Sequence, residues 1–443
     1  MNDQKYVAAI EISSSKIIGA VGRIDSSRRL TILAVEQEEC LDIVRYGIIQ
    51  NLEEVSLRVQ RIIGKLNRNK LVSPREITGV FVGLSGRSMQ SVSSDVKILF
   101  PEQTEITDEV LDRLREDALT NSAIHSRSVV DVIPRSYVVD KMETKSPKGS
   151  IGRSVSAIYD IIVCRQELTQ NLKRALVDKV GLSINKFIVT PVAAGNLILT
   201  DEEKRLGCML VDFGAETTTV CIYCKGSLNY YATIPLGGRN ITRDITSLSV
   251  LEERAEDIKK NSANARRENQ SALNISGLKL SDVSDLVAAR AEEIVTNVIQ
   301  QITYAGLNEK DLPAGIICIG AGSNLRGIME LIENQSGLNA RMGHLPSNIE
   351  AMDLKGKKLE AIQVASILYA GAGAGDYNCL ELPPMEEDPT NIYDTESGGS
   401  YDPNENVEHS ERRPKKGGFM ENMRNKFSKF FAPPTDEDES ELD

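Results

Sequence analysis

Short apolar runs alternate with amphipathic stretches along most of the chain, which is typical of an α/β protein. Three runs of strand character follow one another with short polar turns between them, at residues 6–12, 16–21 and 30–35. Over 52–66 the apolar positions recur with a period of about 3.6 residues, which predicts a helix. The apolar run at 77–84 predicts a return to strand.

The same order of elements begins again about halfway along the chain. Strand-like runs come first, then a helical pattern and then another strand, at residues 208–213, 217–223, 229–234, 282–304 and 316–319. A unit that occurs twice indicates a duplicated domain, and ligands usually bind in the cleft between such copies. The pattern therefore predicts an α/β fold of two related halves around a binding cleft.

Two turns at matching positions of the two copies carry candidate binding chemistry. In each, a carboxylate at a strand end precedes small or hydroxylic residues in a tight turn. Consecutive backbone N–H groups in such a turn can surround phosphate oxygens, and the carboxylate can hold a hydrated Mg²⁺ ion. The predicted phosphate-binding residues are Glu11, Ser13, Ser14, Ser15 and Lys16 in the first turn and Asp212, Gly214, Ala215, Glu216 and Thr217 in the second. Of these, Glu11 and Asp212 are the predicted metal ligands.

A glycine-rich turn follows the predicted strand at 316–319. Its residues are Gly320, Ala321, Gly322, Ser323 and Asn324. Glycines allow the backbone to approach a flat ligand closely, as the base and ribose of a nucleotide require. By itself the turn fits an ordinary strand-to-helix connection better, but its occurrence together with the two phosphate turns favours the nucleotide interpretation.

Seven Cys and three His are scattered along the chain, which fits a reducing compartment. Cys221 and Cys224 form a CxxC, but residues three apart on a strand point to opposite faces, so a metal or redox pair is disfavoured. No apolar stretch approaches the roughly 20 residues that cross a bilayer, and residues 1–6 lack the apolar run of a signal peptide. A cytoplasmic protein is expected.

The formal net charge of −12 comes mainly from the C-terminal part of the chain. Acidic residues dominate 379–411 and 432–443, while 412–431 is rich in Lys and Arg. The rest of the chain is nearly neutral, which argues against nucleic acid as a partner. The first acidic segment is too polar to offset the entropy of ordering, so an extended linker is predicted there.

Six apolar side chains recur at helical spacing within the basic stretch: Phe419, Met420, Met423, Phe427, Phe430 and Phe431. Such a helix can lie in a membrane interface, with its cations near anionic head groups. It can also dock into a groove on a protein. Burial of the six side chains contributes at most about 10 kcal/mol before the cost of forming the helix, which is sufficient for reversible attachment. The membrane interpretation is preferred, and the groove stays open.

The two phosphate turns and the glycine-rich turn, in this order, resemble the phosphate-1, phosphate-2 and adenosine motifs of the actin, heat-shock chaperone and sugar-kinase superfamily. Within it the chain is similar to the FtsA family of bacterial cell-division proteins. Residues 132–140 resemble that family's V-I-P-Q-x-Y-x-V-D run, with Arg135 in place of Gln, and 147–153 resemble its P-x-G-x-x-G segment. The resemblance covers roughly residues 5–377, and the apolar tail resembles the family's membrane-targeting helix.

The resemblance implies an actin-like fold, in which two ribonuclease-H-like lobes surround a nucleotide cleft and the first lobe carries an inserted subdomain. The implied divisions are 1–79, 161–206 and 345–378 for subdomain 1A, 80–160 for the inserted subdomain 1C, 207–245 and 302–344 for subdomain 2A, 246–301 for subdomain 2B, 379–416 for an acidic linker, 417–431 for the amphipathic helix and 432–443 for an acidic tail.

The resemblance also implies a function. The family polymerises like actin at the inner face of the cytoplasmic membrane, binds the C-terminal peptide of the tubulin homologue FtsZ and acts with other division proteins. Its partner-binding pattern falls on Arg290 and Glu293, which are one helical turn apart. An intrahelical ion pair explains the same two residues equally well. A sugar-kinase-like enzyme and a cell-shape or pilus-assembly relative remain alternatives for the whole chain.

ATP with Mg²⁺ is the cofactor that the resemblance implies, with Glu256 and Lys259 near the ribose and Gly237, Gly238 and Asn240 as a second approach to phosphate. The chain departs from the family pattern in both phosphate turns. Ser13, Ala215 and Glu216 stand where the family has glycine, and Thr219 stands where it has a carboxylate. Because Glu216 would repel phosphates, weak nucleotide binding is expected, with slow or no hydrolysis and no catalytic residue assigned.

Overall fold

The computed structural model describes residues 5–122, 124, 126–267, 274–275, 277–351, 361–375 and 377–383. The chain divides into two units, Met1–Pro384 and Met385–Asp443, and the described residues all belong to the first. The predicted linker beyond residue 383, the apolar stripe from Phe419 to Phe431 and the acidic tail lie outside the described residues.

The first half is built on a six-stranded sheet with the strand order β12-β7-β1-β2-β3-β20. Its strands are β1 (Lys5–Ile12), β2 (Lys16–Ile24), β3 (Leu30–Glu39), β7 (Gly79–Leu84), β12 (Ser183–Val189) and β20 (Ile349–Ala351). β1, β2 and β3 form an antiparallel meander, and β7 and β12 continue the sheet in parallel with β1. The three strands predicted near the N-terminus are therefore confirmed.

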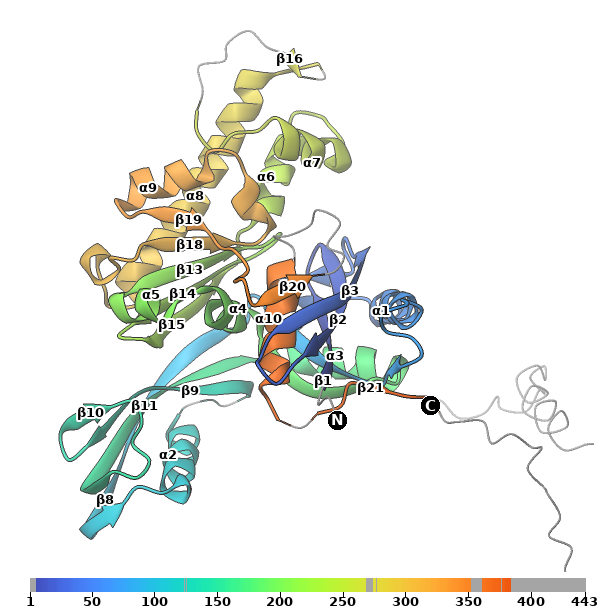
Figure 1. The fold of residues 1–443 in the computed structure, drawn as a ribbon. Helices are drawn as coiled ribbons and strands as arrows, with labels where there is room; N and C mark the ends of the chain where they lie inside the picture. The colour runs from blue at the N-terminus through green and yellow to red at the C-terminus, as the bar shows by residue number, and fades with distance from the viewer. Residues whose placement is uncertain are drawn as a thin grey trace, which may run out of the picture. The chain divides into compact units, whose positions relative to one another are not determined.

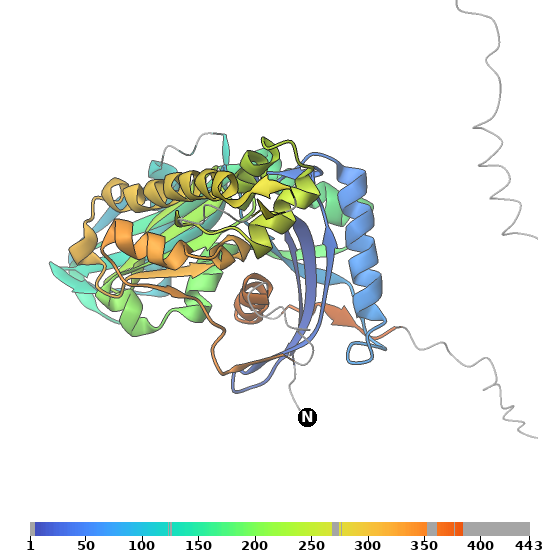
Figure 2. The ribbon, with the colours of Figure 1, turned by 90° about the horizontal axis from the view of Figure 1, so that it is seen from above.

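Helices cover both faces of this sheet (Figure 2). They are α1 (Leu52–Asn67) on one face and α10 (Ala361–Ala372) on the other. A Cβ at Gly19 would lie 2.4 Å from Ile62 of α1, and a Cβ at Gly22 would lie 3.3 Å from Leu368 of α10. Because residues of opposite parity on a strand point to opposite faces, the sheet is held between the two helices. The helix predicted at 52–66 is confirmed, and Asn51 caps it by accepting the N–H of Glu54 at 3.1 Å.

The second half repeats this architecture, with the order β15-β14-β13-β18-β19 in place of β3-β2-β1-β7-β12 (Figure 1). Its elements are β13 (Cys208–Phe213), β14 (Thr218–Cys224), β15 (Ser227–Ile234), α6 (Gly238–Thr246), α7 (Glu252–Asn261), α8 (Leu280–Tyr304), β18 (Ile316–Ile319), α9 (Ile328–Ser336) and β19 (Ala340–Met342). The strand pairs are antiparallel and parallel in the same places as in the first half. The duplicated, actin-like α/β fold is thereby confirmed.

An inserted subdomain follows β7. It consists of β8 (Gln90–Glu105), α2 (Asp108–Asn121), β9 (Arg127–Val139), β10 (Met142–Thr144) and β11 (Ile151–Arg165). Although it interrupts the first half, its sheet extends that of the second half, because Gln90 of β8 pairs with Ala232 of β15. Buried Leu114 and Ala118 fasten α2 to the strands.

The remaining elements connect these parts. They are α3 (Gln166–Lys173), the π-helical turn η1 (Arg174–Lys179), α4 (Thr190–Ile198), α5 (Asp201–Leu206), η2 (Glu309–Asp311), η3 (Ala321–Asn324) and the strand pairs β4 (Val44–Arg45) with β5 (Ile48–Ile49), β6 (Glu76–Ile77) with β21 (Leu380–Glu381) and β16 (Asn274–Ile275) with β17 (Leu278–Lys279). β21 uses the first residues of the predicted linker, and Leu380 is buried there.

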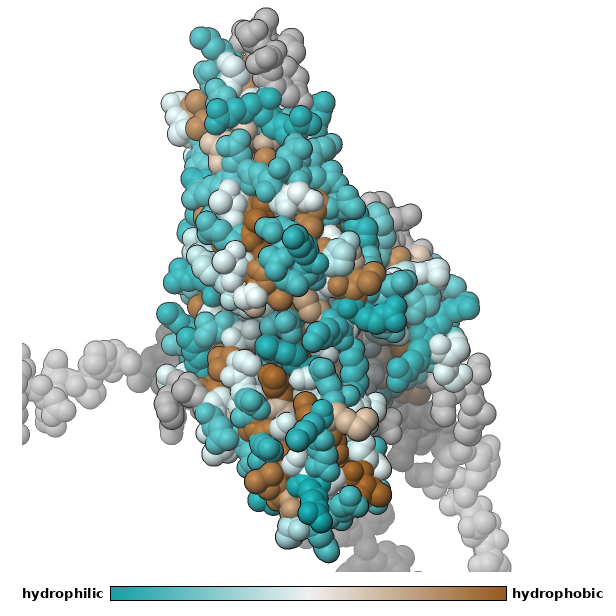
Figure 3. Space-filling model, turned by 90° about the vertical axis from the view of Figure 1, so that its left-hand side faces the viewer, coloured by the Kyte–Doolittle hydropathy of each residue, from teal (hydrophilic) through white to brown (hydrophobic). Residues whose placement is uncertain are grey.

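The surface of the described residues mixes apolar and polar side chains. On the face drawn in Figure 3, apolar patches are interspersed with polar residues. On the inserted subdomain, Leu99 is 71% exposed, Met142 76% and Ile151 65%. In the described part of the chain, no helix has the length and apolar character needed to cross a membrane.

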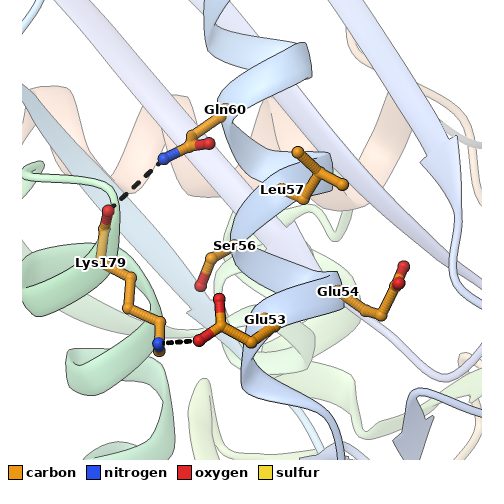
Figure 4. A pocket seen from close by; sticks show the side chains of 6 residues that line it. All are labelled: Glu53, Glu54, Ser56, Leu57, Gln60 and Lys179. Atoms are coloured by element: carbon orange, nitrogen blue, oxygen red, sulfur yellow. Dashed lines mark hydrogen bonds and ion pairs between the residues drawn. The ribbon is translucent and has the colours of Figure 1, made fainter. Parts of the chain in front are cut away.

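Two features of the described residues are excluded as candidate sites. Cys221 packs in the core shared with the first half, while Cys224 packs on the opposite face of the sheet, so the CxxC is no pair, as predicted. A cavity of about 220 Å³ lies between α1 and η1 (Figure 4). There Lys179 forms an ion pair with Glu53 and its carbonyl accepts an N–H of Gln60 at 3.4 Å. None of the predicted site residues lines it.

Candidate functional site

The two predicted phosphate turns have equivalent geometry. In the β1–β2 turn, the N–H of Ser13 donates to the carbonyl of Lys16 at 3.0 Å, and in the β13–β14 turn the N–H of Gly214 donates to the carbonyl of Thr217 at 2.8 Å. Both turns reverse the chain between antiparallel strands after a carboxylate. The two turns that match in sequence position therefore also match in backbone structure.

Both strand-end carboxylates are buried, and the charge of Asp212 acts on Glu11 across the halves. Burial, with the Asp212 charge as the second cause, raises the pKa of Glu11 to about 8, against the opposing effect of Lys16. Burial also raises the pKa of Asp212 to about 6, although the Gln363 amide donates to its Oδ1 at 3.3 Å. Two carboxylates that resist ionisation together form a donor set suited to a hydrated Mg²⁺ ion, whose charge would relieve their repulsion. Among the described residues, no three His, Cys, Asp or Glu side chains form a closed metal centre.

The glycine-rich turn reaches the same place. Gly320 has φ of +84°, and a Cβ there would lie 2.4 Å from Oδ1 of Asp212 and 2.5 Å from the carbonyl oxygen of Phe213. Glycine is therefore required where this turn passes the end of β13. Buried Ser323 donates its hydroxyl to the Gly320 carbonyl at 2.6 Å and stabilises the turn.

The start of α6 packs directly on the second phosphate turn. Gly238 and Arg239 donate their N–H groups to the carbonyls of Gly214 and Ala215, at 3.0 and 2.7 Å. The N–H of Gly237 donates to the Asn240 side chain at 3.0 Å. These amides are thus engaged within the protein. The second approach to phosphate that the sequence suggested supports the turn, instead of presenting these N–H groups to a ligand.

The predicted ribose residues form a partly buried cluster between α6 and α7. The Lys259 ammonium contacts Glu256 at 2.6 Å, the Thr242 hydroxyl at 2.9 Å and the Gly238 carbonyl at 3.1 Å. Burial lowers the pKa of Lys259, although Glu256 opposes this effect. The structure therefore brings Glu256 and Lys259 together with the phosphate turn through Gly238.

Glu216 is held by groups from both halves. Its side chain is 1% exposed, and its Oε1 lies 3.5 Å from both Arg239 Nη1 and Arg243 Nη2. Its Oε2 accepts the N–H of Tyr46 from the first half at 2.7 Å. The expected free negative charge is therefore paired with guanidinium groups. Sequence reasoning missed Arg239 and Arg243, although residues four apart share one helix face and could pair with the same anion. It also missed Tyr46, which no sequence signal identifies.

The predicted partner-binding pair lies on α8 and is engaged within the second half. Arg290 donates to both carboxylate oxygens of Asp244 on α6, at 2.6 and 3.1 Å, and also pairs with Glu293. These contacts raise the pKa of Arg290. The intrahelical pair considered from the sequence is therefore formed, together with a link between two helices. The role of Arg290 and Glu293 in partner binding stays a prediction.

Comparison with known proteins identifies similar chains. The family described as "Cell division protein FtsA" matches residues 209–359, and the "SHS2 domain inserted in FTSA" matches 86–163. The chain is 30% identical to the cell division protein FtsA of Porphyromonas gingivalis over 341 residues, 74% of this chain and 71% of that one. It is 27% identical to that of Bacillus subtilis, covering 77% of this chain and 79% of that one. A solved "PilM-PilN type IV pilus biogenesis complex" is similar in fold, with a TM-score of 0.60 at 16% identity, covering 82% of this chain and 98% of that chain.

Proposed function

Because the chain belongs to the FtsA family of cell-division proteins, we propose that it polymerises at the inner face of the cytoplasmic membrane and anchors the FtsZ ring there. The observation that carries the proposal is the meeting of two equivalent phosphate turns and a glycine-rich turn around Glu11 and Asp212. Actin-like assembly uses such a site. The kinase and pilus-assembly alternatives are set aside because the curated relatives are cell-division proteins.

ATP with Mg²⁺ is the proposed ligand of this site. Glu11 and Asp212 would hold the ion, the turns at 11–16 and 212–217 the phosphates, and the turn at 320–324 the adenosine, with Glu256 and Lys259 beside the ribose. The ion would offset the charge of the phosphates. Weak affinity and slow or absent hydrolysis remain the expectation, since Thr219 supplies no carboxylate and its hydroxyl lies 3.3 Å from that of Thr233.

The domain organisation follows the family in this proposal. Subdomain 1C comprises residues 90–165 in place of the predicted 80–160, because residues 80–84 lie in β7 of the first sheet and β11 extends to Arg165. Residues 246–301 form subdomain 2B, and 417–431 form the membrane-binding helix, attached by the acidic linker. Arg290 and Glu293 of subdomain 2B contact the C-terminal peptide of FtsZ. Since Arg290 already pairs with Asp244, the peptide would share or exchange that partner.

A vesicle recruitment assay tests the whole proposal. FtsZ and the full-length chain are mixed with sedimenting vesicles of phosphatidylglycerol and phosphatidylcholine. FtsZ should sediment with vesicles only when this chain is present, and a chain that ends at residue 416 should recruit none. Failure of the full-length chain to bind anionic vesicles would refute the membrane role.

A pair of variants separates partner binding from helix packing. Arg290→Ala should weaken binding of an FtsZ C-terminal peptide by about tenfold or more, because it removes a charged contact with the peptide. Asp244→Asn removes the same intramolecular ion pair and leaves Arg290 available. Equal peptide binding by both variants and the unmodified chain would show that Arg290 only links α6 to α8.

A further inference from the structure

The Glu216 carboxylate lies between the two halves of the fold. It belongs to the second phosphate turn, yet its Oε2 accepts the Tyr46 N–H from the loop that follows β3. The next amide along that loop, the N–H of Gly47, donates to the hydroxyl of Ser14 in the first phosphate turn at 3.3 Å. The neighbouring amides of Tyr46 and Gly47 therefore donate to one phosphate turn each, to Glu216 in the second turn and to Ser14 in the first.

The groups around Glu216 are those that bind phosphate in proteins. A backbone N–H and two guanidinium groups face one anionic side chain. We call Tyr46 N–H, Arg239 and Arg243 the anion cradle. Arg239 is only 7% exposed, and its buried Nη1 makes no hydrogen bond, although Glu216 lies 3.5 Å away. The anion cradle therefore contains one donor, Arg239 Nη1, that makes no hydrogen bond.

Arg239 also joins the halves directly. Its Nη2 contacts Asp42 of the first half at 2.8 Å, and its Nε contacts Glu252 of α7 at 2.9 Å. Asp42 and Tyr46 both have positive φ, at 64° and 50°, a conformation unfavourable for residues with a side chain. The contacts to Arg239 and Glu216 hold this loop in place.

We propose that Glu216 is a tethered anion that occupies the anion cradle and holds the two halves together in the absence of nucleotide. This inference rests on the proposed nucleotide site, whose phosphates are negatively charged, as Glu216 is, and compete with it for Arg239 and Arg243. Glu216 thus sets the affinity for nucleotide. It acts as a positioning residue, because it keeps the two halves in contact through Tyr46 when no ATP is bound.

Hydrogen exchange of the full-length, nucleotide-free chain tests the contact between halves. In Glu216→Ala the Tyr46 amide loses its acceptor, so exchange in the segment 42–47 should accelerate about tenfold or more. Glu252→Ala is the matched control, because it removes a carboxylate partner of Arg239 within one half. Its exchange at 42–47 should equal that of the unmodified chain. Equal exchange in all three proteins overturns the proposal.

Nucleotide binding tests the competition. Glu216→Gln keeps the shape of the side chain and removes its charge, and it provides a second variant if Glu216→Ala does not fold. With a fluorescent ATP analogue and Mg²⁺, Glu216→Gln should bind about tenfold more tightly than the unmodified chain. Saturating ATP should also restore slow exchange at 42–47 in Glu216→Ala. Unchanged affinity overturns the competition.

The two measurements separate this inference from the proposed function. If neither the unmodified chain nor Glu216→Gln binds ATP, the proposed nucleotide site is wrong. The exchange comparison then decides the inference alone, with faster exchange in Glu216→Ala supporting the tethered anion and equal exchange overturning it.

Discussion

Replacement of Arg135 by Met should destabilise the protein by breaking a buried ion pair within the inserted subdomain and a hydrogen bond from that subdomain to the second half. Arg135 Nε and Nη2 donate to both oxygens of Asp160 at 2.8 and 2.5 Å, and Nη2 also donates to the carbonyl of Asn229 on β15 at 2.9 Å. The Asp160 side chain is 1% exposed, so Met leaves a buried carboxylate without a counterion. Loss of one partner of a buried pair costs about 3–5 kcal/mol. Because Arg135 remains 26% exposed, we expect the lower end of that range.

The pH dependence of this loss follows from Asp160. Burial raises the pKa of Asp160 above its ordinary value of 3.8, an effect that Arg135 opposes. When folding raises the pKa of a carboxyl group, that group does not reduce stability at pH values below its unfolded pKa. As the pH rises from the unfolded pKa towards the folded pKa, the free energy of unfolding decreases. Without Arg135 the folded pKa rises further, so the deficit of the variant should grow between pH 5 and pH 8.

Urea denaturation at these two pH values, followed by circular dichroism, measures the effect. Arg153→Met is the control, since Arg153 lies exposed on the same strand β11 and its change should stay within about 0.5 kcal/mol. A deficit for Arg135→Met that is no larger than that of the control, or that is the same at pH 5 and pH 8, would refute the reasoning.

Three further predictions concern single positions. Asn51→Ala removes the acceptor for the Glu54 N–H at the start of α1 and should lower the free energy of unfolding by about 1 kcal/mol, whereas Asn51→Ser should lower it by less, as denaturation would show. Gly320→Ala places a Cβ 2.4 Å from Asp212 Oδ1 at a positive φ, so it should both destabilise the fold and abolish binding of a fluorescent ATP analogue; normal binding by a stable variant would contradict the assigned turn. Glu11→Gln should reduce the enhancement of ATP binding by Mg²⁺ when the ion is titrated at fixed nucleotide, and an unchanged titration would remove Glu11 from the metal site.

Local chemistry made much of the fold predictable. The helical period from Leu52 to Leu66 and the repeated series of strands are visible without any tertiary information, since each apolar face must be buried against a neighbour. The bounds of these elements shifted by a few residues at most; the strand predicted at 217–223, for example, is β14 (Thr218–Cys224). The structure of the last residues before the predicted linker was harder to predict from the sequence. The composition after 379 predicted a linker, but Leu380 pairs with Ile77 across a long sequence separation.

The candidate site was predictable only in part. The two phosphate turns and the glycine-rich turn follow strands that can be recognised, so their residues could be assigned individually. What surrounds Glu216 could not be assigned, because Asp42, Tyr46 and Arg239 come from loops and helices far apart in the chain. Whether Glu216 only repels phosphate or also stabilises the fold depended on these neighbouring residues. A carboxylate considered in isolation would only repel phosphate, whereas in the structure the same carboxylate pairs with two guanidinium groups and joins the halves by accepting the Tyr46 N–H.

The amino-acid sequence alone determined which units repeat, where the strands end in carboxylates and that the chain resembles a family of division proteins, because these properties depend on short-range pattern and residue type. Only the tertiary structure decided that the sheet of the inserted subdomain continues the second half, and that Arg135 and Glu216 each join separate parts of the chain. The physical reason is that a buried charge takes its partner from whichever backbone or side chain folding brings near, and nothing in the local pattern specifies that neighbour.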